Sequence, residues 1–364
     1  MKILHVITSL LYGGAEKLVA EIAPMIRDKG HEVDVLAFSG AEPNFMHLLE
    51  EKGIRVYTFT EKAEYYSPRF LWRLTRMMRH YDIVHTHNTF PQLFAAIGSL
   101  WLQVSGCFMF KKVSGPRLVT TEHNTNNRRR GIPVLKWADR WMYGRYDRII
   151  CISDKAEANL REYLPELKGV CTIYNGVNVR KFHEAKAIED LHPEGKTVVV
   201  MVAAFRPQKD QKTLIDAMAL LPVEQYELWI VGDGELHDEL HAYAAPYGNV
   251  KFFGNRPDVP EVLHSADIVV MSSHYEGLSL SSVEGMAVGK PFVASDVDGL
   301  HEVVDGYGVL VPHQDAKALA ETIKNLTEDK AYRQQVADRC WERAQMFDIE
   351  KMVGRYNEVY GSLS

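Results

Sequence analysis

The sequence predicts an α/β protein made of two doubly wound domains. Short apolar runs rich in Val and Ile alternate with helical segments, and this alternation occurs twice along the 364 residues. Most of the runs are continuously apolar, which is typical of parallel strands covered on both faces. The length also exceeds what one ordinary hydrophobic core accommodates and suits two domains.

The first half contains seven runs with strand composition, at residues 2–8, 32–38, 54–59, 82–87, 117–123, 148–153 and 170–175. Amphipathic segments separate them. In the first such segment Leu18, Ile22 and Ile26 fall on one helix face. The stretch 88–110 has no charged residue and is long enough to span a membrane. Because polar residues interrupt it and it follows a strand, we favour a buried crossover helix over a membrane span.

The second half repeats the scheme, with runs at residues 197–205, 227–232, 250–254, 267–273, 291–295 and 308–312. The segment 175–196 is rich in charge and turn residues and is interpreted as a loop-like linker. In the last segment, 347–363, three large residues recur every four positions, which predicts a helix that packs on another surface. The expected domains are therefore residues 1–178 and 179–345, with a C-terminal helix over 346–364.

Composition indicates a cytoplasmic protein with one basic region. The net charge is −6, yet residues 61–150 carry 15 Lys/Arg and 6 Asp/Glu, a balance of 15 − 6 = +9. This asymmetry points to an anionic partner reached by one face, although a solvated surface is the simpler alternative. The four cysteines form no CxxC pair, which favours buried thiols over a disulfide framework or zinc site. The N-terminus runs directly into a strand without a basic region and a small-residue cleavage site, so we do not expect secretion.

Two glutamates are the most informative pair in the sequence. Glu276 follows the run 267–273, and Glu284 lies eight positions later in a helix of small residues. At about 1.5 Å per residue the two are about 12 Å apart along a helix. That span suits a ligand with hydroxyl groups at both ends and an anion between them, held by the helix start. A nucleotide-sugar has this shape.

Other candidate ligand-binding residues follow predicted strands. A glycine turn after the first strand opens a helix and allows a diphosphate to approach the backbone, although a structural turn is equally compatible. Two cations follow the first strand of the second domain, where they can neutralise a diphosphate. The run 227–232 ends in a glycine motif, Gly232-Asp233-Gly234, which is weak evidence for ligand binding. The run 250–254 is followed by an arginine whose loop could line a base pocket. These residues are Gly13, Gly14, Arg206, Lys209, Gly232 and Arg256.

Histidines end two predicted strands of the first domain. His123 closes the run 117–123, where a general acid/base, a hydrogen-bond donor to ligand, or a purely structural histidine are all compatible. His85 and His87 share this ambiguity, and we expect at least one of them to serve packing only. No metal or cofactor is expected, because Asp296 and Asp298 lack further oxygen ligands nearby and HDELH at 237–241 is not HExxH.

Arginines recur at helical spacing with aromatic residues between them in SPRFLWRLTRMMRH. This composition is typical of an interfacial helix on anionic lipid. Nucleic acid would also fit the charge but is not expected as a partner, and a solvated arginine face is the third alternative. The candidate acceptor or membrane face contains Arg69, Arg73, Arg76, Arg128 and Arg129.

The ordered motifs resemble a known family over nearly the whole chain. EGLSLSSVE matches the E-x7-E signature of retaining glycosyltransferases with the GT-B fold. Together with YGGAEK, DIVHTHN, TTEHN, CISD, IYNGVN, FRPQKD, VGDGEL and FFGNR, it resembles glycosyltransferase family 4. The resemblance implies two Rossmann-like domains facing each other across a cleft, with a C-terminal helix that crosses back to the N-terminal domain. It also implies that the C-terminal domain holds most of the nucleotide-sugar.

Site roles follow from the resemblance by matching position. It implies that Glu276 contacts the donor sugar and that Glu284 contacts the ribose. It also implies that Lys209 holds the diphosphate beside the Gly13–Gly14 turn, and that the backbone of Ser279 and Leu280 meets the phosphates. His123 is implied to face the reacting sugar or the acceptor. The chain departs from the family at Ala204, where an Arg is usual, and at Asn178, where an Asp is usual. Arg206 is the candidate replacement for the missing cation.

The implied activity is a retaining, metal-independent hexosyl or N-acetylhexosaminyl transfer from a nucleotide-diphosphate sugar, with a uridine donor favoured. Double displacement needs two carboxylates about 5–5.5 Å apart. Glu276 and Glu284 are two helical turns apart and are assigned to opposite ends of the donor, so we favour front-face attack instead. The expected acceptor is a glycan or lipid-linked molecule of surface polysaccharide synthesis. The alternatives are a nucleotide-sugar epimerase of the same fold and a non-catalytic nucleotide-sugar-binding subunit.

Overall fold

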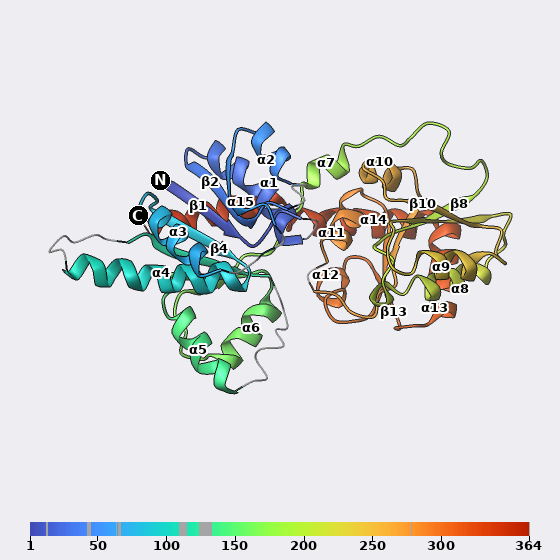
Figure 1. Cartoon of the computed structure of the whole chain (residues 1–364). Helices are drawn as coiled ribbons and strands as arrows, with labels where there is room; N and C mark the ends of the chain where they lie inside the picture. The colour runs from blue at the N-terminus through green and yellow to red at the C-terminus, as the bar shows by residue number, and fades with distance from the viewer. Residues whose placement is uncertain are drawn as a thin grey trace. The chain divides into compact units, whose positions relative to one another are not determined.

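The chain folds into two α/β units (Figure 1). Unit 1 comprises residues 1–175 and 352–364, and unit 2 comprises residues 176–351. The computed structural model describes residues 1–11, 14–41, 45–62, 64, 67–108, 115–123, 133–277 and 279–363. Each unit contains one parallel sheet with helices on its faces, as the sequence predicts.

Unit 1 is built on a seven-stranded sheet. Its strands are β1 Lys2–Ile7, β2 Glu32–Ser39, β3 Arg55–Thr60, β4 Ile83–His87, β5 Arg117–Glu122, β6 Arg148–Cys151 and β7 Val170–Thr172. They lie in the order β3-β2-β1-β4-β5-β6-β7, with parallel pairing throughout. The central strands are fully buried because helices cover both faces, which explains their continuous apolar composition.

Seven helices accompany this sheet in the part of unit 1 that the structure describes. They are α1 Gly14–Asp28, α2 Met46–Glu51, α3 Pro68–Met78, α4 Thr89–Phe108, α5 Pro133–Tyr143, α6 Asp154–Tyr163 and α15 Ile349–Gly361. The predicted crossover helix over the uncharged stretch is α4. The prediction that it is buried is wrong for one side, since Leu100, Trp101 and Val104 are exposed. Within the described residues, no helix combines the length and apolar composition that crossing a membrane requires.

Unit 2 is built on a six-stranded sheet in the order β10-β9-β8-β11-β12-β13, again parallel throughout. Its strands are β8 Thr197–Val202, β9 Tyr226–Val231, β10 Val250–Gly254, β11 Ile268–Met271, β12 Phe292–Ser295 and β13 Val309–Val311. Its helices are α7 Val179–His183, α8 Gln211–Ala219, α9 His237–Ala244, α10 Val259–His264, α11 Leu280–Ala287, α12 His301–Val304, α13 Ala316–Glu328 and α14 Lys330–Gln345.

The segment 175–196 is not wholly a loop, because it contains the short helix α7. Asn178 caps this helix, with its side chain accepting a hydrogen bond from the Lys181 amide at 3.0 Å. Asn and Asp are comparable N-caps, so the family's usual Asp is replaced here without loss of the cap. The prediction of a loop failed because five helical residues are too few to show a periodicity.

The last helix, α15, returns to unit 1 as predicted. Its residues Met352, Tyr356 and Tyr360 are buried. The Tyr360 hydroxyl lies 2.6 Å from Nδ1 of His85 on β4. The four-residue recurrence therefore marks the helix face that packs against the unit 1 sheet.

Candidate active site

The strand order of unit 2 places two candidate residues at one point of its sheet. The order reverses between the neighbouring strands β8 and β11, and ligands of open α/β sheets bind at the carboxyl ends of strands at such a point. Lys209 follows β8 in a 3₁₀ turn, Pro207–Lys209. Glu276 follows β11. The two residues are 67 positions apart in the sequence and meet because their strands are adjacent.

Lys209 and Glu276 form an ion pair that is largely shielded from water. Lys209 Nζ lies 2.5 Å from Glu276 Oε1, and the side chains are 16% and 8% exposed. The Ser273 hydroxyl donates a second hydrogen bond to the same carboxylate oxygen at 2.7 Å. An ammonium held at a strand's carboxyl end is a point charge that suits phosphate, and the carboxylate accepts hydrogen bonds from hydroxyl groups.

The loops that carry this pair are joined by backbone hydrogen bonds. The His274 amide donates to the Gln208 carbonyl at 2.8 Å, and the Gln208 side chain donates to the Tyr275 carbonyl at 2.8 Å. The Glu276 amide donates to the Asp298 carbonyl at 3.0 Å. Gly299 has φ +82°, and a Cβ there would lie 2.3 Å from the Glu276 carbonyl oxygen, so only glycine fits. The position of Glu276 is therefore set by its own loop and by the two loops that follow β8 and β12.

Helix α11 follows Glu276 closely in the chain and carries the second glutamate. The Ser279 hydroxyl accepts a hydrogen bond from the Ser282 amide at 3.3 Å and so caps the helix that Leu280 begins. Glu284 lies inside the helix and is buried. The first amides of the helix form an end with partial positive charge, which favours an anion.

The weak glycine motif after β9 has a packing role. Gly232 has φ +135°, and a Cβ at this position would lie 2.1 Å from the Ala203 carbonyl oxygen. A Cβ on Gly234 would lie 2.6 Å from the Phe205 carbonyl oxygen. The loops after β8 and β9 thus approach too closely for any side chain, which explains both glycines without a ligand.

The two candidate arginines of unit 2 differ in their partners. Arg256 donates to both carboxylate oxygens of Asp258, at 2.7 and 2.5 Å, and this bidentate pair holds the guanidinium against its own loop. The Arg206 side chain is exposed, and within the described residues no acidic group pairs with it. Ala204, where the family has its usual arginine, is also exposed. Arg206 is therefore the cation next to Lys209 that is available for a ligand.

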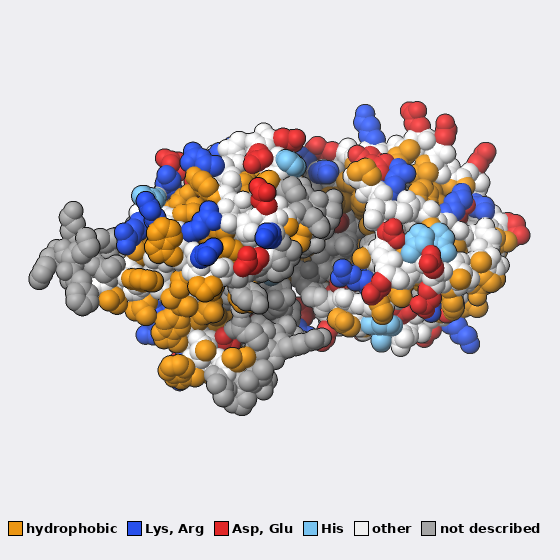
Figure 2. Space-filling view, in the orientation of Figure 1, with side chains coloured by type: hydrophobic (Ala, Val, Ile, Leu, Met, Phe, Trp, Pro, Cys, Tyr) orange, Lys and Arg blue, Asp and Glu red, His pale blue; other side chains and the backbone are white. Residues whose placement is uncertain are grey.

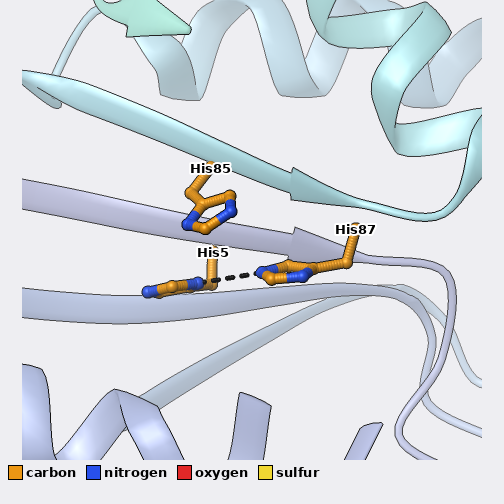
Figure 3. A group of neighbouring side chains, drawn as sticks. All are labelled: His5, His85 and His87. Carbon is orange, nitrogen blue, oxygen red and sulfur yellow. Dashed lines mark hydrogen bonds between the residues drawn. The ribbon is translucent and has the colours of Figure 1, made fainter. Parts of the chain in front are cut away.

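His123 ends a row of histidines in unit 1. It follows β5, is half-buried, and its Nε2 lies 3.0 Å from Nδ1 of His87. His87 Nε2 in turn lies 3.1 Å from Nδ1 of His5 on β1 (Figure 3). Burial lowers the pKa of His5 to about 3 and that of His123 to about 4, and it also lowers the pKa of His87 well below the usual value. All three rings are therefore neutral at physiological pH.

His85 belongs to a separate hydrogen-bond network on the same strand. Its Nδ1 contacts the Tyr360 hydroxyl, and its Nε2 lies 2.8 Å from the Thr121 hydroxyl. Burial lowers the pKa of His85 well below the usual value. His85 thus anchors the terminal helix, which agrees with the expectation that one of the two β4 histidines serves packing. The sequence reasoning missed His5, whose only signal was its place in the first strand opposite the HxH motif.

Of the remaining candidates, Gly14 begins α1. Gly13, Arg128 and Arg129 lie outside the described residues. Arg69, Arg73 and Arg76 are exposed on α3. Arg73 also has a structural contact, because its Nη1 donates to the Phe59 carbonyl at 2.7 Å.

Exposed tryptophans lie next to the α3 arginines. Trp72 on α3 is 58% exposed and Trp101 on α4 is 53% exposed. Both line one surface pocket together with Thr75, Arg76 and Arg79. Figure 2 shows apolar and basic side chains gathered on this part of unit 1. The predicted combination of arginine and exposed aromatic residues is therefore present on a surface.

Comparison with known proteins agrees with this architecture. A family model described as Glycosyltransferase Family 4 matches residues 12–181, and one described as Glycosyl transferases group 1 matches residues 183–343. A glycosyltransferase of Methanocaldococcus jannaschii is 30% identical over 78% of this chain and 76% of its own length. The phosphatidyl-myo-inositol mannosyltransferase of Mycolicibacterium smegmatis is 28% identical over 97% of this chain and 91% of its own length. The crystal structure of Anabaena HepE in complex with UDP is 25% identical, with a TM-score of 0.84 over the full length of both chains.

Two Rossmann-like units, with a lysine–glutamate pair at the switch point of the second, define a glycosyltransferase of the GT-B fold that acts on nucleotide-sugar donors. The fold predicted from the ordered motifs is thereby confirmed. The chain belongs to glycosyltransferase family 4.

Proposed function

We propose that this glycosyltransferase moves a sugar from a UDP-sugar, with retention of anomeric configuration and without a metal ion, to a glycan or lipid-linked acceptor. The observation that carries the proposal is the Lys209–Glu276 pair at the switch point of the unit 2 sheet. It offers one cation for phosphate and one carboxylate for sugar hydroxyls at the same strand ends. A uridine donor is favoured because the similar protein Anabaena HepE crystallised in complex with UDP.

Each candidate residue has a role in this proposal. Lys209, Arg206 and the amides at the Ser279–Leu280 helix start hold the diphosphate. Glu276 accepts hydrogen bonds from the donor sugar, and Glu284 accepts them from the ribose. Arg256 already pairs with Asp258, so it positions a loop beside the base rather than binding phosphate. His123 of unit 1 contacts the reacting sugar or the acceptor.

The reaction proposed is a front-face displacement. The bond between the anomeric carbon and the diphosphate oxygen breaks, and a bond to the acceptor oxygen forms on the same face. The departing diphosphate oxygen takes the acceptor's proton, so the products are the glycoside and UDP. Lys209 and the helix start are held in place before the reaction, and together with Arg206 they stabilise the negative charge that develops on the leaving group.

Thermal denaturation with nucleotides tests the donor assignment. UDP should raise the melting temperature by several degrees, because a ligand at about 100 times its Kd adds about 2.7 kcal/mol of stability. GDP and ADP at the same concentration should give smaller shifts. A larger shift with GDP or ADP would contradict the choice of uridine. The full chain should be used, with EDTA present to test independence from metal.

Peripheral contact with an anionic membrane is the second part of the proposal. Its support is the surface of α3 and α4, where Arg76 lines a pocket with the exposed rings of Trp72 and Trp101, and Arg69 is exposed on the same helix. Tryptophan prefers the interface between water and lipid, and arginine contributes electrostatic attraction to anionic headgroups. The relative from Mycolicibacterium smegmatis acts, by its name, on a phospholipid.

Charge reversal on α3 tests this contact. The Arg69→Glu/Arg76→Glu variant should bind vesicles containing anionic lipid at least about tenfold more weakly, since each basic residue near such a surface contributes about 1 kcal/mol. Arg73 is left unchanged because it holds the Phe59 carbonyl. The matched control is Lys317→Glu/Lys324→Glu on exposed positions of α13 in unit 2. Equal sedimentation of both variants with the vesicles would refute the membrane contact.

A further inference from the structure

The row of histidines in unit 1 reaches His123 through two hydrogen bonds. His5 Nδ1 lies 3.1 Å from His87 Nε2, and His87 Nδ1 lies 3.0 Å from His123 Nε2. His5 and His87 are buried completely, whereas His123 is half-buried at the end of the row. The proposed function uses only His123, and so leaves the two buried rings without a role.

Three neutral imidazoles can satisfy these two hydrogen bonds in only two ways. Each neutral ring has one N–H donor and one acceptor nitrogen, so the bonds must all point in the same direction along the row. In the first arrangement each ring carries its proton on Nδ1, and the row ends with a His123 N–H that is not used within the row. In the second arrangement each proton is on Nε2, and the last N–H is on His5.

The buried end of the row decides between the two arrangements. His5 Nε2 is buried and has no hydrogen-bond partner among the described residues. The second arrangement would leave an N–H donor there without an acceptor, and orphaned buried N–H groups are rarer than unsatisfied acceptors. The first arrangement leaves only an unprotonated nitrogen at that point. The geometry therefore favours Nδ1 protonation along the whole row.

The neighbouring ring holds the row in place and argues against a metal site. Figure 3 shows the His85 ring lying over the hydrogen-bonded His5 and His87 rings. One ring nitrogen of each of His5, His85 and His87 lies within 4.8 Å of the other two, but the His85 and His87 rings stack, with their centres 4.5 Å apart and 27° between the planes. Both nitrogens of His85 already contact hydroxyl groups. Three histidines on these strands therefore form a packed network rather than a set of converging ligands.

We infer that His5 and His87 are positioning residues that fix His123 as the Nδ1–H tautomer, so that His123 donates a hydrogen bond to the sugar or acceptor and is not a general base. The inference rests on the proposed role of His123. It selects one of the three roles that the sequence left open. A donor at this point would bind a sugar oxygen, whereas a base would need an unprotonated Nδ1.

The proton positions can be measured directly on the full chain. The protein would be labelled with ¹⁵N in its histidine rings, and two-bond ¹H–¹⁵N spectra would be recorded near neutral pH. His123→Gln and His87→Asn variants assign the signals. We expect Nδ1 of His123 to have the chemical shift of a protonated nitrogen and Nε2 that of an unprotonated one. A proton on Nε2, averaging between the two nitrogens, or protonation of both would overturn the inference.

Variants of His87 test whether the row causes this state. His87→Leu removes the donor to His123, so the His123 signals should change tautomer or average, and kcat should fall at least tenfold. Asn places an amide donor near the position of Nδ1, so His87→Asn should retain the His123 tautomer and most of the rate. His47→Gln, at an exposed histidine outside the row, is the control. An unchanged His123 spectrum in His87→Leu would refute the positioning role.

The two hypotheses fail in different ways. Full transfer activity in His123→Ala, which removes every side-chain donor at this position, would refute the role of His123 in the proposed function and leave the tautomer measurement valid. A proton on Nε2 of wild-type His123 would refute the inference and leave that role intact. The wild-type spectrum decides the tautomer even if His87→Leu does not fold.

Discussion

Replacing Glu276 by alanine is expected to lower kcat for sugar transfer by about 10²–10³-fold, the usual effect of removing one fixed electrostatic contact to the transition state. The carboxylate is held by Lys209 and the Ser273 hydroxyl, on loops joined by several hydrogen bonds. Its removal deletes the proposed contact to the donor sugar and also leaves Lys209 without its partner. Initial rates with a radiolabelled UDP-sugar and saturating acceptor measure the effect.

Two further variants are needed. One shows whether the charge or the shape of the Glu276 side chain matters, and the other controls for the loss of a glutamate elsewhere on the surface. Glu276→Gln keeps the size and a hydrogen-bond acceptor for Ser273, so it should recover part of the rate if shape matters and none if the charge is required. Glu239→Ala removes an exposed glutamate that pairs with Lys212 in the same unit and should retain wild-type activity. Turnover retained by Glu276→Ala would refute the role given to this carboxylate.

The wild-type product of the same assay addresses the alternatives. Anomeric coupling constants of the glycoside should show the configuration of the donor, and an inverted product would refute the retaining mechanism. A nucleotide-sugar epimerase would instead consume the donor without any acceptor. A non-catalytic subunit would bind UDP and produce neither result.

The sheets were predictable because most of the strands are continuous apolar runs. All thirteen runs correspond to strands, since a buried parallel strand must be apolar on both faces whatever its neighbours are. The helix that carries Glu284 and the return of α15 were predictable for the same reason, namely that a packing face repeats along a helix. Local composition therefore determined which elements form.

Contacts between distant residues were not predictable in this way. The Lys209–Glu276 pair depends on β8 and β11 being neighbours, and nothing local to either residue encodes that order. The same holds for His5, which meets His87 across 82 positions. Arg256 was predicted near the base pocket without its partner Asp258, although an acid two positions away was visible in the sequence. Gly232 was treated as weak evidence for a phosphate loop, and its strand neighbours explain it as a packing requirement.

Replacing Lys209 by methionine is expected both to destabilise unit 2 and to abolish the stabilisation by UDP. Loss of one partner of a buried ion pair typically costs about 3–5 kcal/mol, because the remaining charge is left without compensation in a poorly hydrated site. The group left without its partner is the Glu276 carboxylate, and because its side chain is only 8% exposed, water compensates its charge poorly. Urea denaturation of the full chain and UDP-induced melting shifts measure the two effects separately.

The double variant Lys209→Met/Glu276→Gln distinguishes the structural role of the lysine from its binding role. With both charges removed, no unpaired ion remains, so much of the lost stability should return. The UDP-induced shift should not return, because the cation for the diphosphate is still missing. Lys212→Met, at a partly exposed lysine three positions away, should leave both measurements close to wild type. If the double variant recovered the UDP shift together with its stability, Lys209 would act only through folding, and the diphosphate would have to be held by Arg206 and the start of α11.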